Sequence, residues 1–331
     1  MKKILYFVLF FCIVMLCSGC GSYNEKTLIK DFNKKINQIS SYHIEGKMEI
    51  YNGDDVYKYD VKSSYEDDKY RVSLKNKTNN HEQIILKNDD GVYVLTPSLN
   101  KSFKFQSDWP NNSSQVYILK SIQNDINQDK NVKLIQKDGN YILTSKLANT
   151  NNKNLTNQKI YLDKKLNIVK IEVYDDTGNK QIKMDFNSID VNASFNNKYF
   201  STSENMKSDS NINEKTTFSI DDSIYPMYLP SGTYLSDEEV ISKDDGDRII
   251  LTFQGESPFI LVEESANASP EMEIIPVYGE PTILSDTVGA LSENSVNFIS
   301  NGVEYYIASD ALTMQEILQV AKSISTLPTM K

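Results

Sequence analysis

The sequence predicts an α+β fold in which a large curved antiparallel sheet is followed by a smaller antiparallel α+β domain. Short strand-like segments succeed one another at close spacing, with turn sequences such as NDDG between them. This spacing favours the pairing of consecutive strands, because antiparallel neighbours can be joined by tight turns. A difference in charge between the two halves of the chain predicts two domains.

The first nineteen residues have the layout of an export signal. Lys2 and Lys3 precede the apolar run ILYFVLFFCIVML, residues 4–16, which is too short to cross a hydrocarbon core of about 30 Å. The sequence LCSGCG that follows resembles the bacterial lipobox, whose cysteine is lipidated on sulfur and begins the mature chain. Cys17 departs from that pattern, where Leu is usual. We therefore expect a signal peptide over residues 1–19, lipidation of Cys20, and a position on the extracytoplasmic face of the cell membrane.

The three cysteines of the chain, Cys12, Cys17 and Cys20, all lie in this segment. The alternative is an ordinary secreted protein with a spare cysteine. The rest of the chain can form no disulfide, and it can supply no thiol nucleophile or thiolate metal ligand. Its domains must therefore be held by hydrophobic cores, and about 310 mature residues are enough for two of them.

Charge divides the mature protein. Residues 201–331 contain 6 Lys+Arg and 22 Asp+Glu, a net charge of −16, whereas the whole chain carries −10 and residues 1–200 therefore carry +6. The polar stretch STSENMKSDSNINEK, residues 201–215, lacks hydrophobic periodicity. We expect a first domain over residues 20–200, a linker over 201–215 and an acidic second domain over 216–331.

The first domain is expected to open with a helix over residues 24–39, because Leu28, Phe32, Ile36 and Ile39 fall on one helical face. A second helix is expected over residues 114–126. Strands are expected before and after that second helix, at 42–51, 55–65, 69–75, 82–88, 91–96, 101–106, 132–137, 140–146, 157–163, 167–174 and 180–187.

The second domain repeats this pattern at a smaller scale. Strands are expected at 247–253, 258–264 and 271–278, and a hairpin at 296–309 around Gly302. The last helix is expected over residues 312–324, where Thr313 can cap its first turn. A helix packed on an antiparallel sheet is the resulting architecture.

Residues suited to catalysis are few. The chain has only two histidines, His43 in an alternating strand and His81 in a polar turn, and it has no Walker loop, GxGxxG, GxSxG or HExxH motif. Adjacent acid pairs such as Asp67/Asp68 fall mostly at predicted turns, where Asp is favoured for backbone reasons. A carboxylate-based envelope hydrolase is the alternative that these acids leave open. We expect a non-enzymatic protein without cofactor or metal, and its extracytoplasmic position argues against nucleic-acid binding.

Residues 42–110 carry a family resemblance. The runs YHIEGKMEIY, KYRVSLKN and EQIILKNDDGVYVLTPSLNKSFKFQSDWP resemble the sporulation lipoproteins of the YdcC type, within the superfamily of the carriers LolA and LolB and the regulators RseB/MucB. The acidic C-terminal part resembles a small domain of unknown function from Gram-positive envelope proteins. The resemblance implies a half-open barrel, a strongly curved antiparallel sheet closed by helices, in a spore-forming Gram-positive cell.

In that superfamily the curved sheet of LolA shields acyl chains, so large apolar side chains on the concave face become candidate ligand contacts. Alternation puts Tyr57, Tyr59 and Val61 on one face of a strand, and Tyr70, Val72 and Leu74 on one face of the next. The candidate residues of an apolar hollow are Tyr57, Tyr59, Val72, Leu74, Phe103, Phe105 and Trp109. The alternative is that these side chains fill a closed core against the helices.

Two non-enzymatic functions follow from the resemblance. The first is a lipid-anchored envelope protein that binds lipid or lipoprotein acyl chains in the hollow during sporulation. The second is a regulatory scaffold with a filled hollow that docks a protein partner in sporulation or germination. A membrane held through Cys20, an acyl lipid and an envelope protein are therefore the expected partners.

Overall fold

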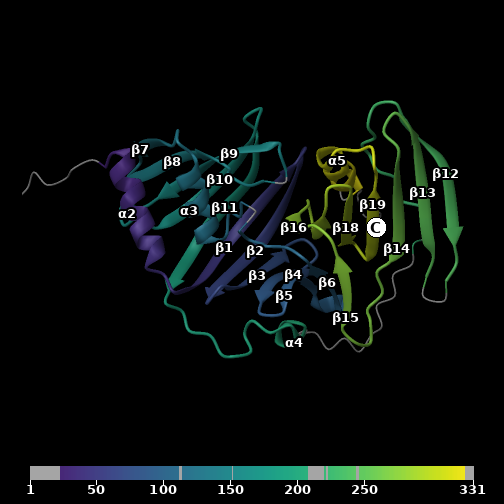
Figure 1. Cartoon of the computed structure of the whole chain (residues 1–331), viewed down its shortest axis with the longest axis horizontal. Coiled ribbons are helices and arrows are strands. Elements are labelled where there is room, and N and C mark those ends of the chain that lie inside the picture. Colours follow the sequence, from purple (N-terminus) through teal and green to yellow (C-terminus); the bar gives the residue numbers. More distant parts are fainter. Residues whose placement is uncertain are drawn as a thin grey trace, which may run out of the picture.

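The structure is a computed structural model that describes residues 23–111, 114–150, 152–207, 220, 223–243 and 246–324. The described chain is mostly β-sheet with few helices, and its strands form two sheets of twelve and seven strands (Figure 1). The twelve-stranded sheet is open, with β15 at one edge and β7 at the other. The signal segment and the lipidation candidate Cys20 lie outside the described residues.

Eleven strands of the large sheet come from the first 200 residues and pair antiparallel in the order β6-β5-β4-β3-β2-β1-β11-β10-β9-β8-β7. The sequence placed all eleven within a few residues. Their bounds are β1 Ser41–Asn52, β2 Asp55–Glu66, β3 Lys69–Asn76, β4 Glu82–Asn88, β5 Gly91–Thr96, β6 Lys101–Phe105, β7 Lys133–Lys137, β8 Asn140–Lys146, β9 Leu155–Leu162, β10 Ile168–Asp175 and β11 Lys180–Val191.

Two helices lie across the inner face of this sheet (Figure 1). Helix α2, Glu25–Asn37, begins at Asn24, whose side chain accepts a hydrogen bond from the Thr27 N–H at 2.9 Å. Helix α3, Leu119–Gln128, is shorter than the predicted helix over 114–126. The Asp125 carboxylate accepts bonds from Ser114 Oγ and from the Ala148 N–H, which ties residue 114 to the chain after β8 and keeps it out of the helix.

The outer face of the large sheet carries a second, smaller layer. Phe200 and Met206 pack on Ile84 and Leu86 of β4, beside the short helix α4, Thr202–Asn205, and a 3₁₀ turn η1, Pro97–Leu99, follows β5. Residues 201–207 are thus folded onto the sheet, although the sequence assigned them to a polar linker. The remaining linker residues, 208–215, lie outside the described residues.

The second sheet has the order β12-β13-β14-β19-β18-β17-β16 and packs against helix α5, Met314–Ile324. Thr313 begins this helix as predicted: its Oγ1 accepts from the Glu316 N–H at 3.3 Å, and Glu316 accepts from the Thr313 N–H at 2.8 Å. The strands are β12 Thr233–Ile241, β13 Arg248–Gly255, β14 Phe259–Ser265, β16 Glu280–Ile283, β17 Val288–Leu291, β18 Ser295–Ser300 and β19 Val303–Ala308.

Strand β15, Glu273–Val277, differs from expectation because it joins the large sheet. It pairs parallel with β6, Ile275 opposite Phe103, so the sheet includes one parallel pair at its edge. Local alternation identifies a strand but not its partner, which is why the sequence placed this segment with the second domain.

The segment between β16 and β17 also reaches the large sheet. The Tyr59 hydroxyl donates to the Ser285 carbonyl at 3.0 Å, and Gln83 Oε1 accepts from the Val288 N–H at 2.7 Å. Buried polar groups are costly unless paired, so these bonds fix residues 284–288 against the inner face. The two sheets are therefore joined by a strand pairing and by a buried polar contact.

Candidate functional site

The residues proposed from sequence for an apolar hollow come together on one face of the large sheet, in one continuous hydrophobic core. Trp109 is fully buried and Tyr57 is partly buried at the margin of that core. The other five, Tyr59, Val72, Leu74, Phe103 and Phe105, are all buried. Tyr59 lies on the same strand face as Val61, and Val72 on the same strand face as Leu74, as alternation predicts, and both of these faces point into the core.

This face is covered by other parts of the chain. Phe32 of α2 and Ile122 of α3 pack on it, and so do Val288 and Ile299 from the second sheet. A cavity bordered by Tyr59 and Leu74 has a volume of about 30 Å³, which is about the share of one water molecule in the liquid. Pockets for small-molecule ligands usually measure about 300–1,000 Å³. In this structure the candidate residues are therefore core residues in contact with protein.

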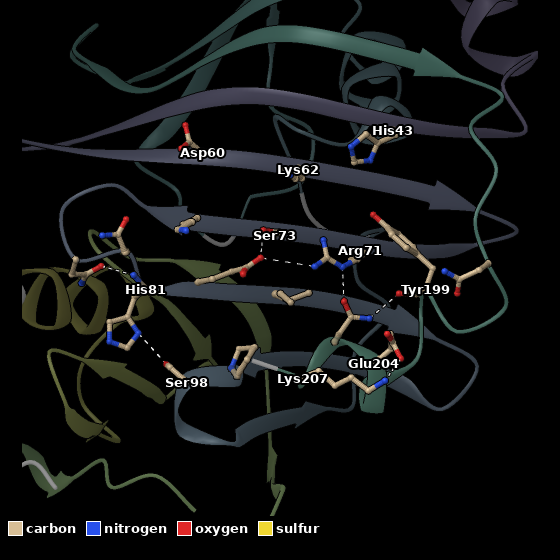
Figure 2. A pocket seen from close by; sticks show the side chains of 18 residues that line it. His43, Asp60, Lys62, Arg71, Ser73, His81, Ser98, Tyr199, Glu204 and Lys207 are labelled. Carbon is tan, nitrogen blue, oxygen red and sulfur yellow. Dashed lines mark hydrogen bonds and ion pairs between the residues drawn. The ribbon is translucent and has the colours of Figure 1, made fainter. Parts of the chain in front are cut away.

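A much larger cavity, of about 960 Å³, opens on the opposite face of the sheet (Figure 2). We call it the outer groove. Its floor is formed by polar side chains of strands β1 to β4, including Lys62, Arg71 and Glu82, and its walls by the 79–81 turn and by the 196–207 segment. Because side chains alternate along a strand, these residues point away from the core that Val61, Val72 and Leu74 help to form.

The acidic side chains of the outer groove each contact a cation. Asp60 lies 3.1 Å from Lys77 Nζ, and Glu204 lies 2.6 Å from Lys207 Nζ. Glu82 accepts from Ser73 Oγ at 2.5 Å and lies 3.9 Å from Arg71 Nη2. Lys75, by contrast, is exposed and makes no ion pair with any residue that the structure describes.

Both histidines of the chain border the outer groove, His43 from β1 and His81 from the turn before β4 (Figure 2). His43 Nδ1 lies 2.9 Å from Ser64 Oγ, and His81 Nδ1 lies 3.3 Å from Ser98 Oγ. Burial lowers the pKa of His81, so its imidazole is neutral near pH 7. A serine–histidine nucleophile needs a carboxylate or similar group to orient the second ring nitrogen. Among the described residues His81 has no such carboxylate, and the nearest one to His43 Nε2 is Glu45 at 3.7 Å, beyond hydrogen-bond distance.

Acidic residues elsewhere have structural positions. Asp67 and Asp68 form a turn with positive φ angles of 48° and 63°, in line with the turn role predicted for such pairs. Glu263 of β14 is fully buried, and its Oε2 accepts from the Ile224 N–H at 3.0 Å. Over the described ranges no group of three or more acidic or imidazole side chains is arranged to hold a metal ion. In the same ranges no helix has the length and apolar character needed to cross a membrane.

The sequence did not reveal the outer groove, because its residues come from four strands and a segment more than 100 residues later. One signal was present. The chain contains 35 Lys+Arg, of which only Arg71 and Arg248 are arginines, and Arg71 lies in the groove. A rare arginine in a lysine-rich chain marks a position where the planar guanidinium matters.

The chain was compared with known proteins. Residues 1–200 match the family described as "Sporulation protein YdcC-like". "Sporulation protein YdcC" of Bacillus subtilis (strain 168) is 36% identical over 316 residues, which cover 94% of this chain and 93% of that protein.

Solved structures give weaker likenesses. The MucA/MucB complex of Pseudomonas aeruginosa matches at 11% identity with a TM-score of 0.33, over 89% of this chain and 97% of that one. A LolA-superfamily protein of Nitrosomonas europaea matches at 13% identity with a TM-score of 0.31, over 55% of this chain and all of that one. Scores this low carry no functional information. The sequence matches decide the family: the chain belongs to the YdcC-like sporulation proteins.

Proposed function

We propose that this protein is a non-enzymatic scaffold of the sporulating cell envelope, held on the extracytoplasmic face of the membrane by lipidation of Cys20, that docks a protein partner. The observation that carries the proposal is the filled inner face of the large sheet. An acyl chain in the hollow would have to displace α2, α3 or residues 284–288. The lipid-carrier function, which the sequence favoured first, is therefore the less supported of the two.

The outer groove is the proposed docking site. It is open, polar and of a size suited to an extended segment of several residues. Its width depends on the 196–207 segment, which Phe200 and Met206 fix to the sheet. The sporulation role rests on family membership, since the relative from Bacillus subtilis is named for it.

The two-domain organisation is part of the proposal. Residues 20–200 would form the docking domain and residues 216–331 an acidic domain, with 201–215 between them. The contacts of β15 with β6 and of Val288 with Gln83 would hold the two domains in one orientation. An acidic surface facing the wall space suits a basic partner or cations, with an affinity that falls as salt rises.

Two measurements test this function. Native mass spectrometry of residues 22–331, purified without detergent, should give the bare protein mass, and a co-purified acyl lipid released by organic solvent would restore the lipid-carrier function. A photo-crosslinking residue at Lys75 of the anchored chain, expressed in sporulating Bacillus subtilis, should capture a discrete protein. The matched control is Lys133, an exposed lysine of β7 on the edge strand farthest from β15. Equal capture from both positions, or none from either, would contradict docking in the groove.

A further inference from the structure

The two arginines of this chain are held in different ways. The Arg248 guanidinium pairs with one acid, because its Nε and Nη2 lie 2.8 Å and 2.7 Å from Glu264 Oε2. Among the described residues, Arg71 has no such close acidic partner for its Nη1 and Nη2 atoms. Its closest carboxylate contact among the described residues is the 3.9 Å approach of Nη2 to Glu82, beyond hydrogen-bond distance.

Arg71 is nevertheless fixed in place. Its Nε donates to Asn205 Oδ1 at 2.5 Å, and its guanidinium carbon lies 5.5 Å from the centre of the Tyr199 ring (Figure 2). Asn205 is buried and is itself held, because its Nδ2 donates to the Tyr199 and Ser201 carbonyls at 2.8 Å and 2.9 Å. The Arg71 side chain is only 16% exposed. The plane of the Arg71 guanidinium is thus set by its contacts with Asn205 and Tyr199 of the 196–207 segment. The Nη1 and Nη2 end of the guanidinium borders the groove.

We propose that Arg71 is the anchoring residue for a carboxylate presented by an extended segment of the protein partner. This deepens the proposed function and depends on it. A guanidinium fork binds a carboxylate through two parallel N–H···O bonds, and a guanidinium that is already oriented loses little freedom on binding. Lys75 borders the same groove and adds positive charge near Arg71, whereas the charge of Lys62 is offset by Glu45 at 3.6 Å.

The groove also indicates what flanks that carboxylate. Asp60, Glu82 and Glu204 line it together with the cations, so its lining is close to neutral. Each of these acids contacts a cation, so the groove has little net charge with which to attract a phosphate-rich surface. A segment in which one carboxylate lies between basic or polar residues can place its cations against the acids and its carboxylate on Arg71. The groove therefore favours a protein segment of mixed charge over an anionic membrane.

The presence of only two arginines makes this directly measurable. In residues 22–331 labelled with ¹⁵N-arginine, the side-chain signals of Arg71 and Arg248 can be separated and assigned with the variant Arg248→Lys. The probe is a capped pentapeptide, Gly-Lys-Glu-Lys-Gly, with a ¹³C-labelled glutamate carboxylate, and its control carries Gln in place of Glu. We expect the Arg71 signals to shift saturably with the Glu peptide, and the affinity for the Gln peptide to be at least tenfold weaker. The Arg248 signals should stay unchanged with both peptides.

Variants separate recognition from general charge. Peptide binding to the variants is followed through the ¹³C label. Arg71→Lys keeps the positive charge but loses the planar guanidinium, and it should weaken binding at least tenfold. Arg248→Lys should leave binding unchanged. Asn205→Ala should also weaken binding, by releasing the guanidinium. If Arg71 signals do not move up to 20 mM peptide, or if both arginines shift linearly and alike, the inference is wrong.

Further outcomes distinguish this inference from the proposed function. A shift with inorganic phosphate or with phosphatidylglycerol vesicles but not with the Glu peptide would overturn the assignment to a protein segment. Capture of the partner from Lys75 in the Arg71→Lys chain, at the level of the unchanged chain, would leave the scaffold function standing and refute the role of Arg71. If the unchanged chain captures nothing, the proposed function fails whatever the peptide does.

Discussion

The contact of Gln83 with residues 287–288 gives the sharpest stability prediction. The Gln83 amide, buried between the two sheets, accepts from the Val288 N–H at 2.7 Å and from Thr287 Oγ1 at 3.0 Å. The variant Gln83→Met retains nearly the same length and shape but cannot accept these bonds. Thr287 keeps a partner, because its single hydroxyl proton can be donated to the Ile299 carbonyl, 2.6 Å away, instead of to Gln83. The Val288 N–H would be left buried without one.

An unsatisfied buried donor costs roughly 1–3 kcal/mol, so we expect the free energy of unfolding to fall by about 2 kcal/mol. That is a change of roughly 30-fold in the folding equilibrium. With a urea dependence of about 3 kcal/mol/M the unfolding midpoint would drop by about 0.7 M. The measurement is equilibrium unfolding in urea of residues 22–331, followed by circular dichroism.

The matched control is Gln128→Met, because Gln128 is exposed near the end of α3 and bonds only to Asn124. Exposed substitutions of this kind usually change stability by less than about 0.5 kcal/mol. If Gln83→Met costs no more than this control, the contact between the sheets does not contribute as its geometry indicates. A loss confined to a separate, earlier transition would show that the second sheet unfolds by itself.

Three further predictions follow from other contacts. Burial raises the pKa of Glu263 to about 7. The protonated side chain therefore stabilises the fold fully below about pH 4.5, and on the order of 3 kcal/mol of unfolding free energy is lost as the pH rises to about 7. In Glu263→Gln, urea unfolding at pH 5 and pH 8 should no longer show this loss. An unchanged pH profile would contradict it. Cys20→Ser should release the protein from membranes into the medium, as fractionation and immunoblotting would show, and continued retention would refute lipidation. Gly46→Ala should lower stability by roughly 1–3 kcal/mol, because the new Cβ would meet Met184 and lie 2.5 Å from the Asp185 carbonyl oxygen; an unaltered melting temperature would show that the strands can move apart.

Much of the fold follows from local signals. Turn sequences such as those at Asp67 and Asp68 separate alternating segments. The alternation groups Val72 with Leu74 on one face of a strand, and the structure shows that this face points into the core. Strand β12 was not predicted, since its sequence TYLSDEEVI does not alternate and its pairing register shifts between Leu235 and Asp237. An exposed edge strand has no apolar face that a sequence pattern could reveal.

What covers a face is harder to predict than the face itself. The apolar residues of the large sheet were identified, but an open hollow and a filled core have the same alternation. The inner face is filled partly by Val288 and Ile299, which lie more than 180 residues after Phe103 in the sequence. The outer groove escaped prediction for the same reason, because the Asn205 and Tyr199 side chains that orient Arg71 come from more than 120 residues later in the chain. Such contacts depend on the path of the whole chain.

The position of β15 late in the sequence has a consequence for folding. The outer edge of β6 is completed by residues 273–277, about 170 positions further along the chain. While the chain is being synthesised, that edge has unpaired N–H and C=O groups until residues 273–277 have been made. Open strand edges are sites where nascent chains pair with one another instead of with themselves. Truncation between residues 192 and 272 should therefore yield chains that aggregate, even though every strand from β1 to β11 is present.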